Sequence, residues 1–207
     1  MRTSTKVSTS YLVKVAMLGV LAYVVMFLEF ALPFFPSFLK LDLSDLPALL
    51  GALALGPAAG IVIELLKNLL HLITTHTGGV GELANFIVGS AFVATAGAIY
   101  ARRRTKRGAL AGLLFAILAM IVAGALVNYF ITIPLYAIVL GWSTEMIVGM
   151  SAKVIPAIHD KLSLIVFAFC PFNLLKGVAL TLITVPLYKK VSPLLKREGM
   201  REGKQAL

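Results

Sequence analysis

The segment Cys170-Pro-Phe-Asn-Leu-Leu-Lys-Gly177 places an amide and an ammonium group inside an apolar run that extends over residues 162–188. This run is long enough and apolar enough to form a membrane-spanning helix. Asn173 and Lys176 are three residues apart, so they lie on one face of that helix. A lysine near the centre of a bilayer costs about 2.5–3.5 kcal/mol on insertion scales. We therefore expect Lys176 to face protein, a water-filled cavity or a ligand, with the other helices arranged around it.

The composition indicates an integral membrane protein. Of the 207 residues 59% are hydrophobic and only 14% are charged, and the mean hydropathy is +0.95. A soluble domain of this size carries much more polar surface. The single cysteine, Cys170, excludes an internal disulfide and predicts ordinary packing. The first apolar run begins at Tyr11, is too long for a signal-peptide core and lacks a small-residue cleavage site, so we expect it to be retained.

The distribution of the net charge of +10 predicts the orientation in the membrane. Most of the 19 Lys and Arg residues lie in three clusters, and the positive-inside rule places all three in the cytoplasm. Membrane topology explains these clusters with fewer assumptions than nucleic-acid binding does, and we expect no nucleic-acid partner. The clusters are Arg2, Lys6 and Lys14; Arg102, Arg103, Arg104, Lys106 and Arg107; and Lys189, Lys190, Lys196, Arg197, Arg201 and Lys204.

The number of crossings depends on the segment 46–73, which Gly56-Pro57 interrupts. If this segment crossed once, the basic run 102–107 would lie outside while the N-terminus lay inside. Two crossings place all three basic clusters on one side, with the short first helix packed inside the bundle. The sequence therefore predicts an all-α membrane protein: one six-helix transmembrane domain with cytoplasmic N- and C-termini. The expected spans are 11–32, 46–55, 57–74, 81–101, 108–140 and 162–188, followed by a basic tail over 189–207.

The first loop carries both apolar and acidic residues. Pro33-Phe-Phe-Pro36 ends the first span, because the residue before a proline avoids helical geometry. The segment 37–46 alternates apolar and polar residues, which predicts a short extended stretch. Pro47 then suits the first turn of a helix, with Asp45 or Leu46 as its N-cap. The segment is either an exposed connector or a cover over a cavity.

Polar residues follow one face of the third helix. Glu64, Lys67, Asn68 and His71 have i, i+3, i+4 and i+7 spacing. Glu64 and Lys67 can pair locally, and for Lys67 we favour a self-contained structural stripe because intramembrane charges usually pair with one another. His71 and His76 lack the repeated pattern of a metal site.

Further polar residues interrupt the fourth and fifth spans. Glu82 lies in the first turn of its helix, where the helix dipole favours a carboxylate. Asn85, one turn further, is equally consistent with a packing hydrogen bond and a ligand contact. Asn128, Tyr129 and Thr132 suit a planar polar ligand, but also hydrogen bonds between helices, which are the commoner use of Asn and Thr in membranes.

No catalytic motif is recognisable in the sequence. It contains no nucleotide-binding loop, no His-Glu-x-x-His, no cysteine pair and no Gly-x-Ser-x-Gly. Its acidic residues do not recur in the clusters that hold a metal. We therefore expect no enzyme activity, metal or cofactor. The intramembrane polar residues concentrate toward the outer ends of spans four to six, which favours a binding pocket open to the outside.

Five segments, in order, resemble the riboflavin-specific S component of the bacterial energy-coupling-factor (ECF) vitamin transporters. They are Leu41-Asp-Leu-Ser-Asp-Leu-Pro47, Glu64-Leu-Leu-Lys-Asn-Leu69, Gly81-Glu-Leu-Ala-Asn-Phe86, Asn128-Tyr-Phe130 and Pro171-Phe-Asn-Leu-Leu-Lys-Gly177, and the resemblance extends over residues 11–190. It implies a substrate-capture subunit in the bacterial plasma membrane with no ATPase of its own. Its partners would be a membrane coupling (T) subunit and two cytoplasmic ATPases, so ATP would be hydrolysed only on the partners.

The resemblance also implies which residues bind riboflavin. Asn128, Asn173 and Lys176 would contact the edge of the flavin ring, and the loop 40–46 would cover it. Because riboflavin is neutral, Lys176 would act mainly as a hydrogen-bond donor. The predicted substrate-binding residues are Lys40, Leu41, Asp42, Leu43, Glu82, Asn85, Asn128, Tyr129, Thr132, Asn173 and Lys176.

Docking of the coupling subunit is predicted on the first span. Related S components often present Ala-x-x-x-Ala there, whereas here Ala16 is followed by Val20 and Ala22 by Met26. The small residues Ala16, Gly19 and Ala22 form a ridge at three-residue spacing that serves either this docking or internal packing.

Three alternatives remain open. The same fold could bind another vitamin, such as thiamine or a pyridoxine-like molecule. The chain could be a membrane enzyme that uses Lys176 or Glu64 as an acid or base. It could also be a structural protein whose polar residues only join helices.

Overall fold

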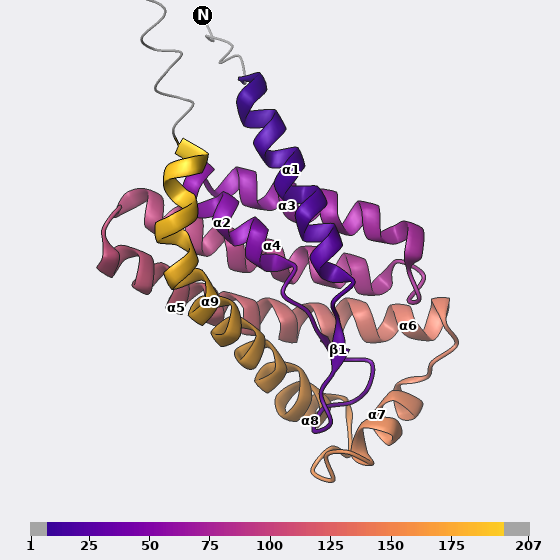
Figure 1. Cartoon of the computed structure of the whole chain (residues 1–207). Helices are drawn as coiled ribbons and strands as arrows, with labels where there is room; N and C mark the ends of the chain where they lie inside the picture. Colours follow the sequence, from indigo (N-terminus) through magenta and orange to yellow (C-terminus); the bar gives the residue numbers. More distant parts are fainter. Residues whose placement is uncertain (1–7, 197–207) are drawn as a thin grey trace, which may run out of the picture.

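The computed structural model describes residues 8–196, with side chains as far as residue 188. The described chain is almost entirely helical (Figure 1). Its elements are α1 (Thr9–Met26), β1 (Phe30–Ala31), β2 (Lys40–Leu41), α2 (Asp45–Leu55), α3 (Pro57–His71), the 3₁₀ turn η1 (Leu72–Thr74), α4 (Val80–Arg102), α5 (Lys106–Val127), the π turn η2 (Asn128–Thr132), α6 (Ile133–Val139), α7 (Thr144–Ala152), α8 (Lys161–Leu164), the π turn η3 (Ile165–Phe169) and α9 (Cys170–Lys196).

Five helical segments are long and apolar enough to cross a membrane. They are Thr9–Met26, Pro57–Thr74, Val80–Arg102, Lys106–Val139 and Lys161–Tyr188. Helix α2 has only 11 residues, so it is roughly 16 Å long, about half the thickness of a bilayer core. It contacts α1, α3, α4 and α9, and most of its residues are buried. This short helix is therefore an interior element of the bundle.

The first helix is shorter than predicted. We expected it to continue to residue 32, but α1 ends at Met26. Phe30 and Ala31 instead form β1, which pairs antiparallel with Leu41 and Lys40 of β2. The extended stretch expected within residues 37–46 is present at these two β2 residues. Strand pairing, which joins residues distant in sequence, ends the helix before the prolines can do so.

Helices α2 and α3 meet at a turn that requires glycine. Gly56 has φ of 111°, a conformation that other residues rarely adopt. Pro57 starts α3, where its missing N–H breaks no helical hydrogen bond. Gly60 then lets the two helices pack closely, since a Cβ there would lie 2.7 Å from the Ala52 Cβ.

The two long segments in the second half of the chain each contain one π turn, at η2 and η3. A π turn inserts one residue into a helix, changes the direction of the side chains that follow, and is frequent at functional sites. The two turns contact each other. The segment 141–160, which connects the fifth and sixth predicted spans, contains helix α7, whose Ile147 and Ser151 are buried.

Two apolar cores hold the molecule together. The first fills the space between α1–α5 and α9. The second lies under the first loop, among α6–α9. The start of α1, the end of α9 and the α4–α5 turn occupy the upper left of Figure 1, and α7 and α8 the lower right. Arg2, Lys6 and the side chains of the predicted basic tail lie outside the described residues.

Candidate functional site

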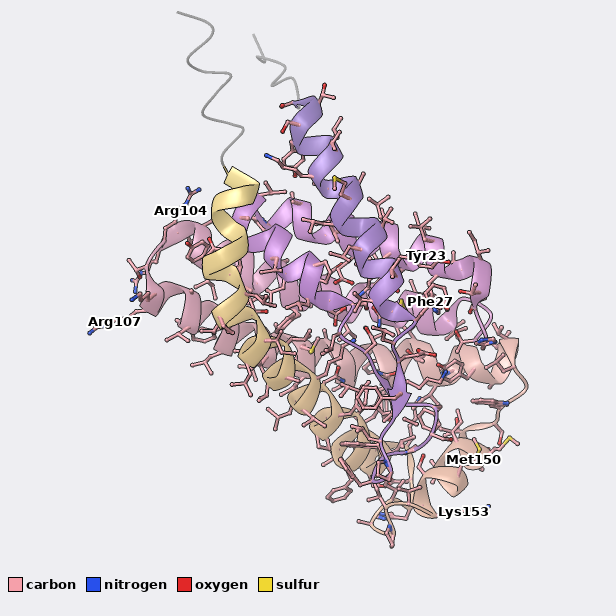
Figure 2. The ribbon with its side chains drawn as sticks, in the orientation of Figure 1. Tyr23, Phe27, Arg104, Arg107, Met150 and Lys153 are labelled. Atoms are coloured by element: carbon pink, nitrogen blue, oxygen red, sulfur yellow. The ribbon has the colours of Figure 1, made fainter. Side chains whose placement is uncertain are left out.

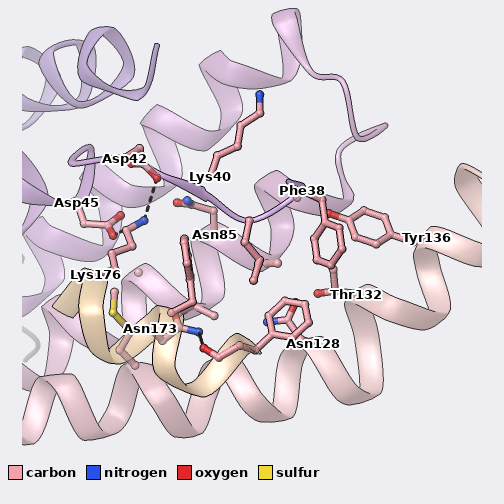
Figure 3. A pocket seen from close by; sticks show the side chains of 18 residues that line it. Phe38, Lys40, Asp42, Asp45, Asn85, Asn128, Thr132, Tyr136, Asn173 and Lys176 are labelled. Carbon is pink, nitrogen blue, oxygen red and sulfur yellow. Dashed lines mark hydrogen bonds and ion pairs between the residues drawn. The ribbon is translucent and has the colours of Figure 1, made fainter. Parts of the chain in front are cut away.

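A cavity of about 140 Å³ lies between the first loop and the helices α4, α5 and α9 (Figure 3). A second cavity of about 370 Å³ adjoins it and shares Phe38, Lys40, Asp42, Gly81, Asn85 and Tyr136 with it. Pockets that bind small molecules combine apolar walls with a few polar groups, and this pair has that character. The residues that line the first cavity are Phe38, Leu39, Lys40, Asp42, Asp45, Gly81, Ala84, Asn85, Val88, Gly89, Met120, Asn128, Thr132, Tyr136, Phe169, Phe172, Asn173 and Lys176.

Most of the predicted substrate-binding residues meet in this cavity. Its lining includes Lys40, Asp42, Asn85, Asn128, Thr132, Asn173 and Lys176. Glu82 lines the adjoining cavity.

The lining of the two cavities, as far as the structure describes it, omits Leu41, Leu43 and Tyr129. Leu41 belongs to the second core, and Leu43 packs against the first. The Tyr129 ring instead lies under the ammonium group of Lys161, 4.3 Å from the ring centroid.

Asn128 and Asn173 are held by their own helices. The Asn128 amide donates to the Gly124 carbonyl at 2.8 Å, and the Asn173 amide donates to the Phe169 carbonyl at 2.9 Å. A Cβ on Gly124 would lie 2.4 Å from the Asn173 amide nitrogen, so only glycine allows α9 this close to α5. These bonds orient the two side chains and leave each amide oxygen available to accept a hydrogen bond.

Lys176 is paired with two carboxylates. Its Nζ lies 3.0 Å from Asp42 Oδ2 and 2.9 Å from Asp45 Oδ2, and the side chain is almost fully buried. Figure 3 shows Asp42 reaching Lys176 from the loop above α9. Burial raises the pKa of the Asp42 carboxyl, but the Lys176 and Lys67 ammonium groups and the Ser44 hydrogen bond together lower it more, so the pKa of Asp42 lies below its ordinary value. Lys176 therefore faces the cavity, as predicted, and its charge is also compensated by two acidic residues.

Asp45 was missed as a site residue. We expected Asp45 or Leu46 to be the N-cap of its helix, but the N-cap is Ser44. Asp45 is the first helical residue, and its fully buried carboxylate points inward. A carboxylate in the first turn of a helix is common at surfaces, so the sequence contained no signal that this one is buried.

The polar stripe on α3 is not self-contained. Lys67 Nζ pairs with Glu64 Oε2 at 2.8 Å, as predicted, but it also pairs with Asp45 on α2. His71 Nδ1 lies 2.9 Å from Glu82 Oε1 on α4. The stripe therefore joins α3 to its neighbours, because a buried charge needs more partners than one helix turn supplies.

Aromatic walls complete the cavity, and spacing alone did not reveal them. Phe38 of the loop faces Phe169, with ring centroids 6.2 Å apart. Tyr136 and Phe172 also line the cavity. Lys40 points away from the polar pair Asn128 and Asn173 in Figure 3, toward its ion-pair partner Glu29.

The predicted docking ridge is divided by the fold. Ala22 is fully buried, and Gly19 is buried against α3, where a Cβ would lie 3.0 Å from the Leu66 Cβ. Ala16 is exposed. The three residues therefore do not form one exposed surface, because Gly19 packs against α3 and Ala22 is buried in the first core.

The described residues contain no group of three or more His, Cys, Asp or Glu side chains that could hold a metal ion. The lining of the cavity instead includes two ammonium groups, three amides, two hydroxyls, two carboxylates and several aromatic rings. These groups suit a small molecule with a flat apolar body and a hydrogen-bonding edge.

Comparison with known proteins assigns the family. The profile of the family "ECF transporter, substrate-specific component" matches residues 10–188. The chain is 36% identical over 186 residues to riboflavin transporter RibU of Staphylococcus aureus (strain TCH60), covering 90% of this chain and 92% of the relative. It is 32% identical over 192 residues to riboflavin transporter FmnP of Bacillus subtilis (strain 168), covering 90% and 94%.

A solved structure, the S component of a bacterial ECF transporter, has the same fold. It superposes with a TM-score of 0.70 at 33% identity, covering 90% of this chain and 97% of that one. Together with the apolar helices, these matches identify an integral membrane protein. The chain belongs to the family of substrate-specific components of ECF transporters.

Proposed function

We propose that this chain captures riboflavin for an ATP-driven importer. The observation that carries the proposal is the convergence of Asn128, Asn173 and Lys176, from two helices, on one cavity beneath the first loop. The relatives from S. aureus and B. subtilis are both riboflavin transporters. The family and these relatives are transport proteins, so they argue against the alternative of a membrane enzyme.

The chemistry of the cavity supports a flavin. The isoalloxazine ring is flat and apolar on both faces, with carbonyl and nitrogen acceptors and one N–H donor along its polar edge. The Lys176 ammonium can donate to the acceptors, and the amide oxygens of Asn128 and Asn173 can accept from the donor. Phe38 and Phe169 would pack against the ring faces. The adjoining cavity, which includes Glu82 and Asn85, would receive the polar ribityl chain.

We further propose six crossings, with both termini in the cytoplasm of a bacterial cell. The five long helices and the interior helix α2 are compatible with this count. In Figure 2, Arg104 and Arg107 lie at the end of the molecule where α9 ends, and Met150 and Lys153 lie at the opposite end. By the positive-inside rule the first end is cytoplasmic, so the loop-covered cavity would open outward.

The partners in this proposal are a membrane coupling subunit and two cytoplasmic ATPases. The sequence has no nucleotide-binding loop, so the energy must come from another chain. Exposed apolar residues of α1, with Ala16 among them, are available to a membrane partner. Gly19 and Ala22 would contribute indirectly, by placing α1 against α3.

An absorbance spectrum of the protein purified alone in detergent tests the ligand. We expect flavin bands in about one-to-one ratio with protein, and quenching of the fluorescence of added riboflavin. A colourless preparation that quenches nothing would contradict the flavin assignment. Binding of thiamine or a pyridoxine-like vitamin to that preparation would indicate the same fold with a different substrate.

The site is tested by the double variant Lys176→Met with Asp42→Asn. It removes one positive and one negative group that pair with each other, so the net formal charge around the cavity is unchanged. We expect it to unfold at nearly the wild-type temperature but to bind riboflavin at least about tenfold more weakly, since a donor to the ring is lost. Thr184→Val is the matched control, because Thr184 is buried on the same helix, donates its hydroxyl to the Leu180 carbonyl of that helix and does not line the cavity. Equal loss in both variants would contradict a specific role for Lys176.

A further inference from the structure

Behind the cavity lies a cluster of five ionisable side chains that are at most 5% exposed. They come from four separate elements. The members are Asp42 from the first loop, Asp45 from α2, Glu64 and Lys67 from α3, and Lys176 from α9. Asp42, Asp45 and Lys176 line the cavity, whereas Glu64 and Lys67 lie behind it.

Asp45 is the only described carboxylate that contacts both lysines. Its Oδ2 lies 2.9 Å from Lys176 Nζ, and its Oδ1 accepts a hydrogen bond from Lys67. Lys67 is held in turn by Glu64 Oε2 at 2.8 Å. The side chains therefore form a chain from Lys176 through Asp45 and Lys67 to Glu64, and each link is a contact between buried ionisable groups.

Position and contacts distinguish Asp45 from Asp42. Asp45 lies on helix α2 and contacts both lysines, whereas Asp42 contacts Lys176 and lies on a loop, where the Ser44 N–H donates to its Oδ1 at 2.8 Å. A ligand that takes the place of Asp42 on Lys176 therefore leaves both lysines paired with Asp45. One that displaced Asp45 would remove a counter-charge from both lysines at once, at a large desolvation penalty.

Close packing fixes the acidic side of this chain. Gly89 of α4 lies against both carboxylates, and a Cβ there would be 2.6 Å from Glu64 Oε2 and 3.2 Å from Asp45 Oδ1. Because the Gly89 backbone occupies this space, Asp45 and Glu64 cannot move toward α4. Asp45 is thus held by packing on one side and by Lys67 on the other.

We propose that Asp45, fixed from behind by Lys67 and Glu64, is the positioning residue that holds Lys176 in place for the ligand, while Asp42 is an exchangeable partner that the ligand replaces. This inference rests on the proposed function, since the ligand assigned to the cavity is riboflavin. Asp45 itself need not touch the ligand.

A double-mutant cycle tests the proposal with the full-length chain in detergent. Riboflavin affinity is measured by fluorescence quenching for wild type, Asp45→Asn, Lys176→Gln and the double variant. We expect Asp45→Asn to weaken binding at least about tenfold, and to weaken it much less when Lys176 is already glutamine. Asp42→Asn should bind more tightly than wild type, because a competitor for Lys176 is removed. A residue that acts only through the fold gives additive effects, as Thr184→Val should with Lys176→Gln.

Two results would overturn the proposal: additive losses from Asp45→Asn and Lys176→Gln, or an Asp42→Asn variant that loses as much affinity as Asp45→Asn. If Asp45→Asn does not yield folded protein, the cycle is run with Glu64→Gln/Lys67→Met, which removes one charge of each sign behind Asp45. Non-additivity with Lys176→Gln supports the positioning role, and additivity overturns it. A wild-type protein that binds no riboflavin contradicts the proposed function instead, so the two failures are distinguishable.

Discussion

At the scale of single residues, the site combines fixed amides with compensated charges. Asn128 and Asn173 are oriented by carbonyls of their own helices, so their position depends mainly on local geometry. Lys176 depends on Asp42 and Asp45, which are more than 130 positions away in the chain. Because Asp45 and Glu64 also lie against Gly89, a small residue at such a contact can matter as much as a polar one.

Gly89 provides a test at this scale. Gly89→Ala forces a methyl group to within 2.6 Å of the Glu64 carboxylate, and we expect a destabilisation of about 1–3 kcal/mol from overpacking together with weaker riboflavin binding. The matched control is Gly149→Ala in α7, where a Cβ would meet nothing within 4 Å. That variant should be stabilised by roughly 0.5–1 kcal/mol, because alanine is the better helix former. Thermal unfolding in detergent measures both, and an unaffected Gly89→Ala would show that the cluster can rearrange.

At the scale of elements, breaks in regular helices determine where the polar groups point. The π turn η2 carries both Asn128 and Thr132, and η3 ends immediately before α9, which carries Asn173 and Lys176. The helix that leads into η3 begins with a capping box, in which Asp160 Oδ1 accepts from the Ser163 N–H at 2.6 Å and from the Ser163 hydroxyl at 2.7 Å. The start of this segment is therefore fixed by a titratable group.

The cap predicts a pH dependence of local stability. The Ser163 N–H and hydroxyl hold the pKa of Asp160 below its ordinary 3.8. Because the folded pKa is depressed, the stabilisation is fully present above the ordinary value and is lost as pH falls through the folded value. Amide hydrogen exchange over residues 161–164 should therefore accelerate at acidic pH relative to Asp160→Asn, which keeps an acceptor at the cap but does not titrate there. Parallel pH profiles for the two proteins would contradict this role.

At the scale of the whole molecule, the basic α4–α5 turn and the α7 segment lie at opposite ends (Figure 2). This separation gives the bundle a polarity that topology can test. The proposed crossing number depends on the short helix α2, which is only about half as long as a membrane core is thick.

Cysteine labelling of intact cells tests the orientation. After Cys170→Ala removes the native thiol, single cysteines are placed at the exposed positions Arg104 and Lys153. An impermeant maleimide should label Lys153→Cys from outside, and Arg104→Cys only after permeabilisation, because six crossings with a cytoplasmic N-terminus require it. The reverse pattern would contradict six crossings with a cytoplasmic N-terminus.

The sequence by itself determined the class of the protein and predicted several of the residues that line the candidate site. Hydropathy marked the long helices, since transfer into a bilayer depends on composition rather than on tertiary contacts. The i, i+3 spacing placed Asn173 and Lys176 on one face, and ordered motifs indicated the family. These features are local, so they can be predicted from the sequence.

Only the tertiary structure decided what compensates the buried charges and which small residues are covered. Asp45 resembles an ordinary helix start until α2 packs against α3 and α9 and turns it into the shared partner of two lysines. Gly19 and Ala22 fit docking and internal packing equally well in the sequence, and the fold buries both of them, Gly19 against Leu66 of α3. Met26 ends α1 because of a strand pairing with the loop. In each case the deciding contact joins separate elements of the fold, and no local pattern contains it.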